Sequence, residues 1–169
     1  MRNKFIAIAV LLIASSATAF SQATATATAT ATILTPISIT KDVDMNFGNV
    51  AVQAATGGTV VLAPAGTRIA TGGVTLPANT GTVTAASFTV TGQADYTYFV
   101  TLPSSPVTLS DGGSNTMTVS NFTSDPAGTS GVLTLGTQTL NVGATLNVGA
   151  GQAAGTYLSQ PFDVTVNYN

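Results

Sequence analysis

The side chains that could do chemistry are few, and the densest group lies in one short segment. Asp42, Asp44 and Asn46 are spaced two residues apart, like the oxygen ligands at the start of a calcium-binding loop. Such a loop needs a glycine at its sixth position and a glutamate at its twelfth, where this sequence has Phe47 and Gln53. In a β-strand the same three side chains simply share the solvent-facing side. We therefore expect no metal site here.

The residue types on which most active sites depend are missing. The sequence has no Cys, His or Trp, and all six acidic residues are Asp, which excludes zinc sites, cysteine nucleophiles and Ser-His-Asp triads. The carboxylates are scattered, and several (Asp95, Asp111, Asp125) lie among turn residues, which does not suit paired-carboxylate hydrolysis. Only 6% of the residues are charged and the net charge is −2, so no basic surface for nucleic acid is expected. We predict no enzyme, no cofactor and no nucleic-acid partner.

The first 19 residues have the pattern of a secretory signal peptide. Arg2 and Lys4 precede the apolar run 5–14, and Ala-Thr-Ala at 17–19 fits the cleavage sequence. The apolar run is about half as long as the ~20 residues that a membrane span needs. We therefore predict an exported protein that has no membrane span after cleavage.

Removal of this segment changes the charge balance. Lys41 and Arg68 then remain as the only basic residues against six aspartates, which gives a net charge of −4. We expect both basic side chains to be solvated. About 150 residues are left, the size of one domain.

Hydrophobic and polar residues alternate along almost the whole remaining chain, and no long window has helical spacing. The abundant Thr and Val residues suit a pleated sheet, and Gly, Pro, Asn and Asp recur at short intervals, as turns require. The pattern predicts an all-β fold, an antiparallel β-sandwich or barrel. The expected strands are 37–47, 59–62, 68–76 (interrupted at Gly72-Gly73), 86–91, 96–102, 107–109, 117–122, 131–135, 139–142, 146–148 and 162–169.

Three finer expectations concern individual strands. Within 37–47, one face should carry Ile37, Ile39, Val43, Met45 and Phe47. Segments 131–135 and 139–142 should pair as a hairpin through a turn at Gly136. The hexapeptide Thr-Leu-Asn-Val-Gly-Ala occurs twice in succession, at 139–144 and 145–150, which we interpret as two adjacent short strands with glycine turns.

An alternating run of five Ala-Thr pairs, 23–32, is the most informative stretch. About twelve extended residues would span ~40 Å. We weigh three interpretations: a disordered low-complexity leader, an edge strand of its own domain, and a donor strand that completes the sheet of another subunit. We favour the donor strand, because Pro36 lacks an N–H and would end such an arm cleanly. One face of the arm carries Ala23, Ala25, Ala27, Ala29, Ala31 and Ile33.

The C-terminal segment alternates as strictly as the arm. After Gly155 the apolar positions are Phe162, Val164, Val166 and the penultimate residue Tyr168. Together with the signal peptide, the arm and the segment 44–48, this ending resembles bacterial pilin-type subunits of the chaperone–usher kind. It is also similar to the spore coat protein U-like and related uncharacterised secreted β-domains.

The resemblance implies an immunoglobulin-like β-sandwich that lacks its last strand. The open groove would be filled first by a periplasmic chaperone and then, at an usher, by the arm of a neighbouring subunit. The alternating residues of 162–168 would lie along the edge that the chaperone pairs with. The expected organisation is a signal peptide at 1–19, an arm at 20–35 and a β-sandwich domain at 36–169.

We therefore predict a structural subunit of a surface filament or coat that polymerises with copies of itself. It would pass through the periplasm to the cell surface or the extracellular space. The main alternative is a secreted β-sandwich that binds carbohydrate or a host surface through loops such as 110–116 or 124–131. A third interpretation is a passive surface protein whose leader is merely a tether.

Overall fold

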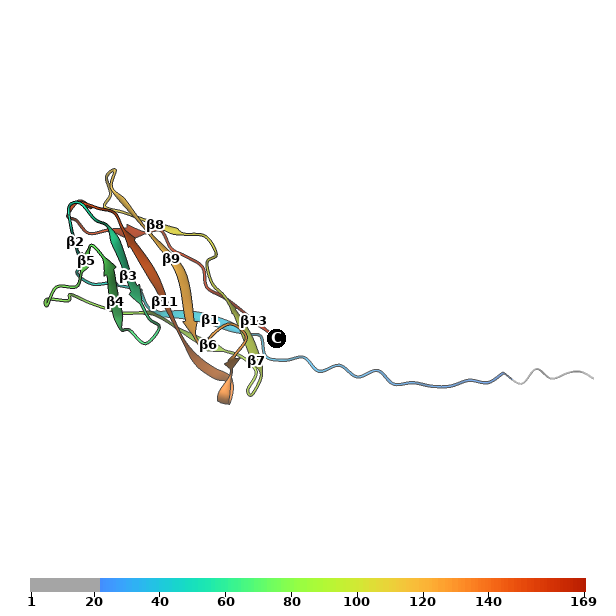
Figure 1. The fold of residues 1–169 in the computed structure, drawn as a ribbon. Coiled ribbons are helices and arrows are strands. Elements are labelled where there is room, and N and C mark those ends of the chain that lie inside the picture. Colours follow the sequence, from blue (N-terminus) through green and yellow to red (C-terminus); the bar gives the residue numbers. More distant parts are fainter. Residues whose placement is uncertain (1–21) are drawn as a thin grey trace, which may run out of the picture. The chain divides into compact units, whose positions relative to one another are not determined.

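Antiparallel β-strands build the folded part of the chain (Figure 1). The computed structural model describes residues 22–169, so the signal peptide expected at 1–19 lies outside the described residues. Within this range there is no α-helix, only the 3₁₀ turn η1 (Thr134–Gly136), and no helix long and apolar enough to cross a membrane. The strands are β1 (Ser38–Val43), β2 (Ala51–Val52), β3 (Gly58–Leu62), β4 (Arg68–Gly72), β5 (Val74–Thr75), β6 (Ala86–Thr91), β7 (Thr97–Thr101), β8 (Val107–Ser110), β9 (Thr116–Asp125), β10 (Gly131–Val132), β11 (Thr137–Val148), β12 (Leu158–Ser159) and β13 (Thr165–Tyr168).

The strands form three sheets. The largest has the strand order β1-β6-β11-β9-β8-β12, and β3 and β4 join it through β11. A second sheet has the order β10-β7-β13, and β2 pairs with β5 in a third. All these pairings are antiparallel. The predicted all-β, antiparallel sandwich-like fold is therefore confirmed.

All but the last two residues of the repeated hexapeptide lie in one long strand, β11, so the prediction of two short strands with a glycine turn between them is wrong. A six-residue repeat has an even length, so both copies present their Leu and Val side chains to the same face. All four of these side chains are buried: Leu140, Val142, Leu146 and Val148. A Cβ at Gly143 would collide with the carbonyl oxygen of Leu62 on β3, which explains a glycine inside the strand.

β11 connects two parts of the hydrophobic core. Along one edge its first half pairs with β6 and its second half with β3, while β9 pairs along the opposite edge. The first half contributes Leu140 to a cluster that includes Tyr98, and the second half contributes Leu146 to a cluster that includes Leu62. Each half of β11 therefore serves a different cluster.

The hairpin predicted for 131–135 and 139–142 is also wrong. β10 pairs with β7, and the corresponding part of β11 pairs with β6. The side chain of Leu133 is completely buried, and its main chain exchanges hydrogen bonds with the neighbourhood of β7, at Asp95 and Tyr96. Because Leu133 packs and bonds here, the segment before η1 pairs with β7 and not with β11.

The predicted strand 37–47 is shorter than expected: β1 covers 38–43, and its pairing with β6 shifts register between Lys41 and Val43. Such a β-bulge turns the following side chain. Val43 is 42% exposed, whereas Met45 and Phe47 pack against the core. The expectation of a common inner face is therefore wrong for Val43.

Arg68 is not simply solvated, contrary to expectation. Its guanidinium donates hydrogen bonds to the main-chain oxygen of Phe47, to that of Asn49 at 3.0 Å and to that of Thr80 at 3.4 Å. Arg68 therefore ties β4 to two loops that have few other connections to it. Elsewhere the predictions are close: β6 covers 86–91, and β4 ends at Gly72, with only Gly73 between it and β5.

Candidate assembly site

Two edge strands lie next to each other in the domain. β1 is the last strand of the largest sheet and pairs only with β6, and β13 is the last strand of the three-stranded sheet and pairs only with β7. β1 and β13 approach each other, and both lie near the C-terminus in Figure 1. Within residues 22–169, each of them therefore has one edge without a strand partner.

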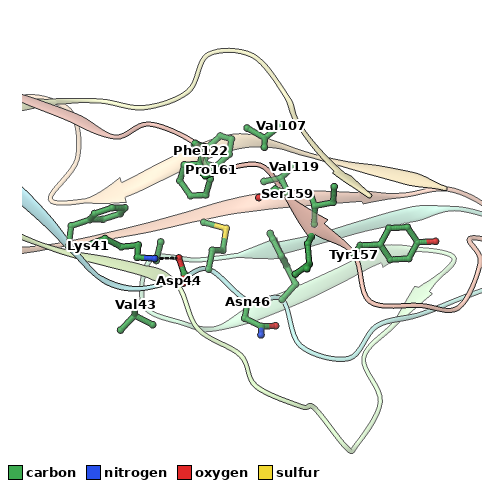
Figure 2. Close-up of a pocket in the computed structure, with 17 residues that line it drawn as sticks. Lys41, Val43, Asp44, Asn46, Val107, Val119, Phe122, Tyr157, Ser159 and Pro161 are labelled. Atoms are coloured by element: carbon green, nitrogen blue, oxygen red, sulfur yellow. Dashed lines mark hydrogen bonds and ion pairs between the residues drawn. The ribbon is translucent and has the colours of Figure 1, made fainter. Parts of the chain in front are cut away.

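A cavity of about 490 Å³ opens between the end of β1 and the segment that leads into β13 (Figure 2). One wall is formed by 41–47 and the other by 157–162. Between the walls lie Phe88 of β6 and Phe122 of β9, and the rings of Phe122 and Phe162 are 5.0 Å apart between centroids. We call the space between these walls the open groove; its floor is apolar.

The segment 160–164 forms the rim of the open groove. Within the described chain, its main-chain groups make no hydrogen bond to other main-chain groups. Phe162 and Val164 are half-buried whereas Asp163 is exposed, so the side chains alternate as in a strand. Free main-chain groups next to alternating apolar side chains are the features that allow a further strand to be added.

An ion pair lies at the mouth of the open groove. Lys41 Nζ is 2.7 Å from Asp44 Oδ1, and the two side chains are 55% and 81% exposed. In Figure 2 Lys41 extends toward Asp44, and Val43 between them in the sequence also lines the cavity. Because the groove is open to water, this pair keeps most of its hydration.

The polar residues that could suggest a calcium loop have other contacts. Asp42 accepts a hydrogen bond from the Thr89 hydroxyl at 2.8 Å, Asp44 pairs with Lys41, and Asn46 accepts from the Gly48 N–H at 2.8 Å. Among residues 22–169 no three acidic side chains come together as metal ligands.

The Ala-Thr run carries no strand. The structure assigns none from Gln22 to Ile37, so the interpretation as an edge strand of its own domain is wrong. Residues 22–33 are all exposed, and Ile33 is 94% exposed. The predicted donor face is thus fully available to solvent on Ala23, Ala25, Ala27, Ala29, Ala31 and Ile33.

Four of the five C-terminal site residues lie along the rim and on β13. Val166 is buried, and Phe162, Val164 and Tyr168 are half-buried. Gly155 lies apart from them, in an exposed bend before β12. A Cβ at Gly155 would meet its nearest atom, the Cβ of Asp111, at an ordinary 3.7 Å, so nothing in the structure explains a glycine there.

Sequence reasoning missed part of the open groove. β12 is only two residues long, and its Leu158 is 72% exposed beside the cavity. Lys41 was not recognised as a groove residue, because its position depends on the pairing of β1 with β6. Two residues without a clear alternating pattern carry no signal that could have identified β12.

A family model described as a domain of unknown function, DUF4402, matches residues 37–168. The chain belongs to this family. The DUF4402 domain begins directly after Pro36, so it includes both edge strands and the open groove and leaves the Ala-Thr run outside. No curated protein and no solved structure matches the chain.

Proposed function

We propose that this chain is an exported structural subunit of a surface filament or coat. Residues 22–33 of one copy would enter the open groove of the next copy as an added β-strand. The observation that carries the proposal is the pair of unpartnered edges, β1 and 160–168, on either side of an apolar cavity.

The main chain would supply most of the affinity. Each net hydrogen bond to the free groups of 160–164 would contribute about 0.5–1.5 kcal/mol. Tyr168 lies near Thr35, and Phe162 lies near 41–47, so the two edges run in opposite directions. A strand between them would be antiparallel to one edge and parallel to the other.

The side chains of the arm suit a groove of this kind. In an added strand, alternate side chains face the receiving domain, so the alanines would point inward and the threonines outward. Five alanine methyl groups, each about the size of a water molecule (~30 Å³), would occupy less than half of the cavity.

Charge also favours the pairing. Residues 22–37 contain no charged side chain, and Lys41 and Asp44 neutralise each other at the mouth of the groove. Inserting the arm would therefore bury no unpaired charge, which would otherwise be costly.

The route to assembly is proposed from the resemblance to chaperone–usher subunits. An exported domain with an apolar open groove needs a cover before its neighbour arrives, because exposed edges and apolar surfaces aggregate. A periplasmic chaperone would provide this cover, and an usher would exchange it for the arm.

The alternation of the arm allows a matched experiment on the chain without residues 1–19. Ala27→Asp places a carboxylate on the inward face, and Thr28→Asp places the same group on the outward face. We expect Ala27→Asp to abolish assembly and Thr28→Asp to preserve it, with size measured by light scattering after gel filtration. Equal assembly of both variants, or a wild-type chain that stays monomeric at high concentration, would contradict the proposal.

A further inference from the structure

We propose that Thr35, Gln93 and Tyr168 form a clamp at the root of the arm that makes strand donation intermolecular. The clamp prevents the arm from folding back into the open groove of its own subunit. This inference rests on the proposed function, because it concerns which copy of the groove the arm enters.

The clamp is a closed set of hydrogen bonds. The N–H and the hydroxyl of Thr35 both donate to Gln93 Oε1, at 3.3 and 3.2 Å. The Tyr168 hydroxyl donates to the main-chain oxygen of Thr35 at 2.7 Å and accepts from the Gln93 N–H at 2.6 Å. Both main-chain groups of Thr35 are therefore held by the domain.

The position of the Tyr168 hydroxyl is fixed by its surroundings. A Cβ at residue 92 would collide with this hydroxyl, so Gly92 leaves the room that it needs. The ring of Tyr168 meets that of Tyr96 edge-on, with centroids 6.0 Å apart. The clamp thus depends on contacts from three separate parts of the chain.

The strand register shows which way the chain runs through the clamp. Ser38 pairs with Thr91 and Ile39 with Val90, so the continued register places Pro36 opposite Gln93. Pro36 has no N–H for the ladder, and the side chain of Gln93 bonds instead to Thr35. Residues 35–37 therefore prolong the path of β1 and do not turn back along it.

For all of residues 22–33 to enter the groove of the same subunit, the chain would have to reverse within 34–37. The tight turns that join neighbouring strands need positive φ at one or both central residues. Pro36 is fixed near a φ of −65°, and the β-branched Thr35 disfavours positive φ. The reversal would also break every bond that Thr35 makes in the clamp. The arm of a neighbouring copy meets none of these obstacles.

The test compares four versions of the chain without residues 1–19. The double variant Thr35→Asn, Pro36→Gly supplies a turn sequence that favours a two-residue hairpin. It should give a stable monomer whose arm is protected from protease. Tyr168→Phe removes only the hydroxyl, and loss of one such hydrogen bond should raise the share of protected monomer about fivefold over wild type. Tyr96→Phe, which removes a hydroxyl from the ring beside Tyr168, should leave that share unchanged.

The outcomes separate this inference from the proposed function. If the wild-type chain assembles but the double variant and Tyr168→Phe assemble to the same extent, with unprotected arms in their monomers, the clamp is refuted. If the wild-type chain does not assemble and no variant has a protected arm, the groove does not accept the arm, and the proposed function fails as well. A protected monomer in the double variant alone would show that the turn, and not the Tyr168 hydroxyl, enforces donation.

Discussion

Lys41 on β1 stands opposite Phe88 on β6, so the side chain of a lysine begins on the inner face of the sheet. Its ammonium group reaches past the apolar residues to Asp44, 2.7 Å away at the mouth of the open groove. A charged side chain that points inward from an edge strand discourages unwanted pairing with other edges. Under the proposed function, β1 has to accept the arm and still avoid unwanted pairing with other edges, and Lys41 serves the second of these needs.

Replacing Lys41 should strengthen assembly and reduce solubility. In Lys41→Leu the apolar floor extends to the mouth of the groove, and partial burial of the leucine would contribute about 1.4 kcal/mol. The concentration at which half of the full chain is assembled should fall about tenfold, as measured by sedimentation velocity. Thr40→Leu, on the outer face of the same strand, is the control and should leave this concentration unchanged. An unchanged midpoint in Lys41→Leu would show that Lys41 does not limit the groove.

Tyr98 carries a buried hydroxyl without a hydrogen-bond partner, the one such side-chain atom among the described residues. Tyr98→Phe should therefore increase the free energy of unfolding at pH 7 by about 1 kcal/mol, measured with urea. Tyr96→Phe, at an exposed ring, should have little effect. A loss of stability in Tyr98→Phe would show that the hydroxyl has a partner after all.

The same residue predicts how stability depends on pH. Burial raises the pKa of Tyr98 above its ordinary value of 10.0, so the folded state keeps the neutral phenol when the unfolded state has begun to ionise. The contribution of Tyr98 to the unfolding free energy should therefore be constant below about pH 10 and be lost as the pH rises through the raised pKa. Tyr98→Phe should lose this part of the alkaline decrease, which urea titrations at several pH values would detect.

Arg68 should be important for stability although it forms no ion pair within residues 22–169. Arg68→Met leaves the main-chain oxygens of Phe47, Asn49 and Thr80 without their shared donor. We expect a loss of about 2 kcal/mol in the free energy of unfolding, since hydrogen bonds to charged groups are the stronger ones. Arg68→Lys should recover only part of it, because a single ammonium group cannot span three acceptors. An unchanged free energy of unfolding in Arg68→Met would mean that water molecules satisfy the three main-chain oxygens as well as the guanidinium does.

The repeated hexapeptide offers an internal control for the role of glycine. Gly143→Ala should destabilise the fold by about 1–3 kcal/mol, because the new Cβ would collide with main-chain atoms of Leu62. At the equivalent place in the second copy, Gly149→Ala would meet only the flexible end of Gln152, at 3.2 Å. Thermal unfolding of the two variants should therefore differ clearly. Similar unfolding temperatures would show that β3 can move away from β11.

Alternation was sufficient to predict the strands whose ends carry turn residues. It located β6 at 86–91, and the interruption that it predicted at Gly72-Gly73 coincides with the end of β4 at Gly72 and the break at Gly73. It failed at β11, because Gly143 has the local signature of a turn and is instead required by a close approach of β3. The sequence also could not identify the strand that pairs with β10. A period-two pattern shows which side chains face inward but not which strand lies alongside.

The candidate site was likewise predictable only in part. The alternating residues of 162–168 and the arm could be identified from the sequence, since both have a strict period of two. The remaining parts could not. On the wall 41–47, the inward position of Lys41 follows from the pairing of β1 with β6. On the wall 157–162, β12 is too short to show a pattern. The clamp at Thr35 joins residues up to 133 positions apart, and such contacts exist only in the folded chain.

The division of β11 between two hydrophobic clusters has a consequence for how the domain comes apart. A fold with two separate cores could melt in two stages, but here Leu140 and Leu146 belong to one continuous strand. Removing either half of β11 from the sheet would also disrupt the pairing of the other half, because the two halves are one continuous strand. Denaturation should therefore be a single cooperative event, with the slowest amide exchange in the middle of β11, so that the domain would unfold as a whole under mechanical force as well.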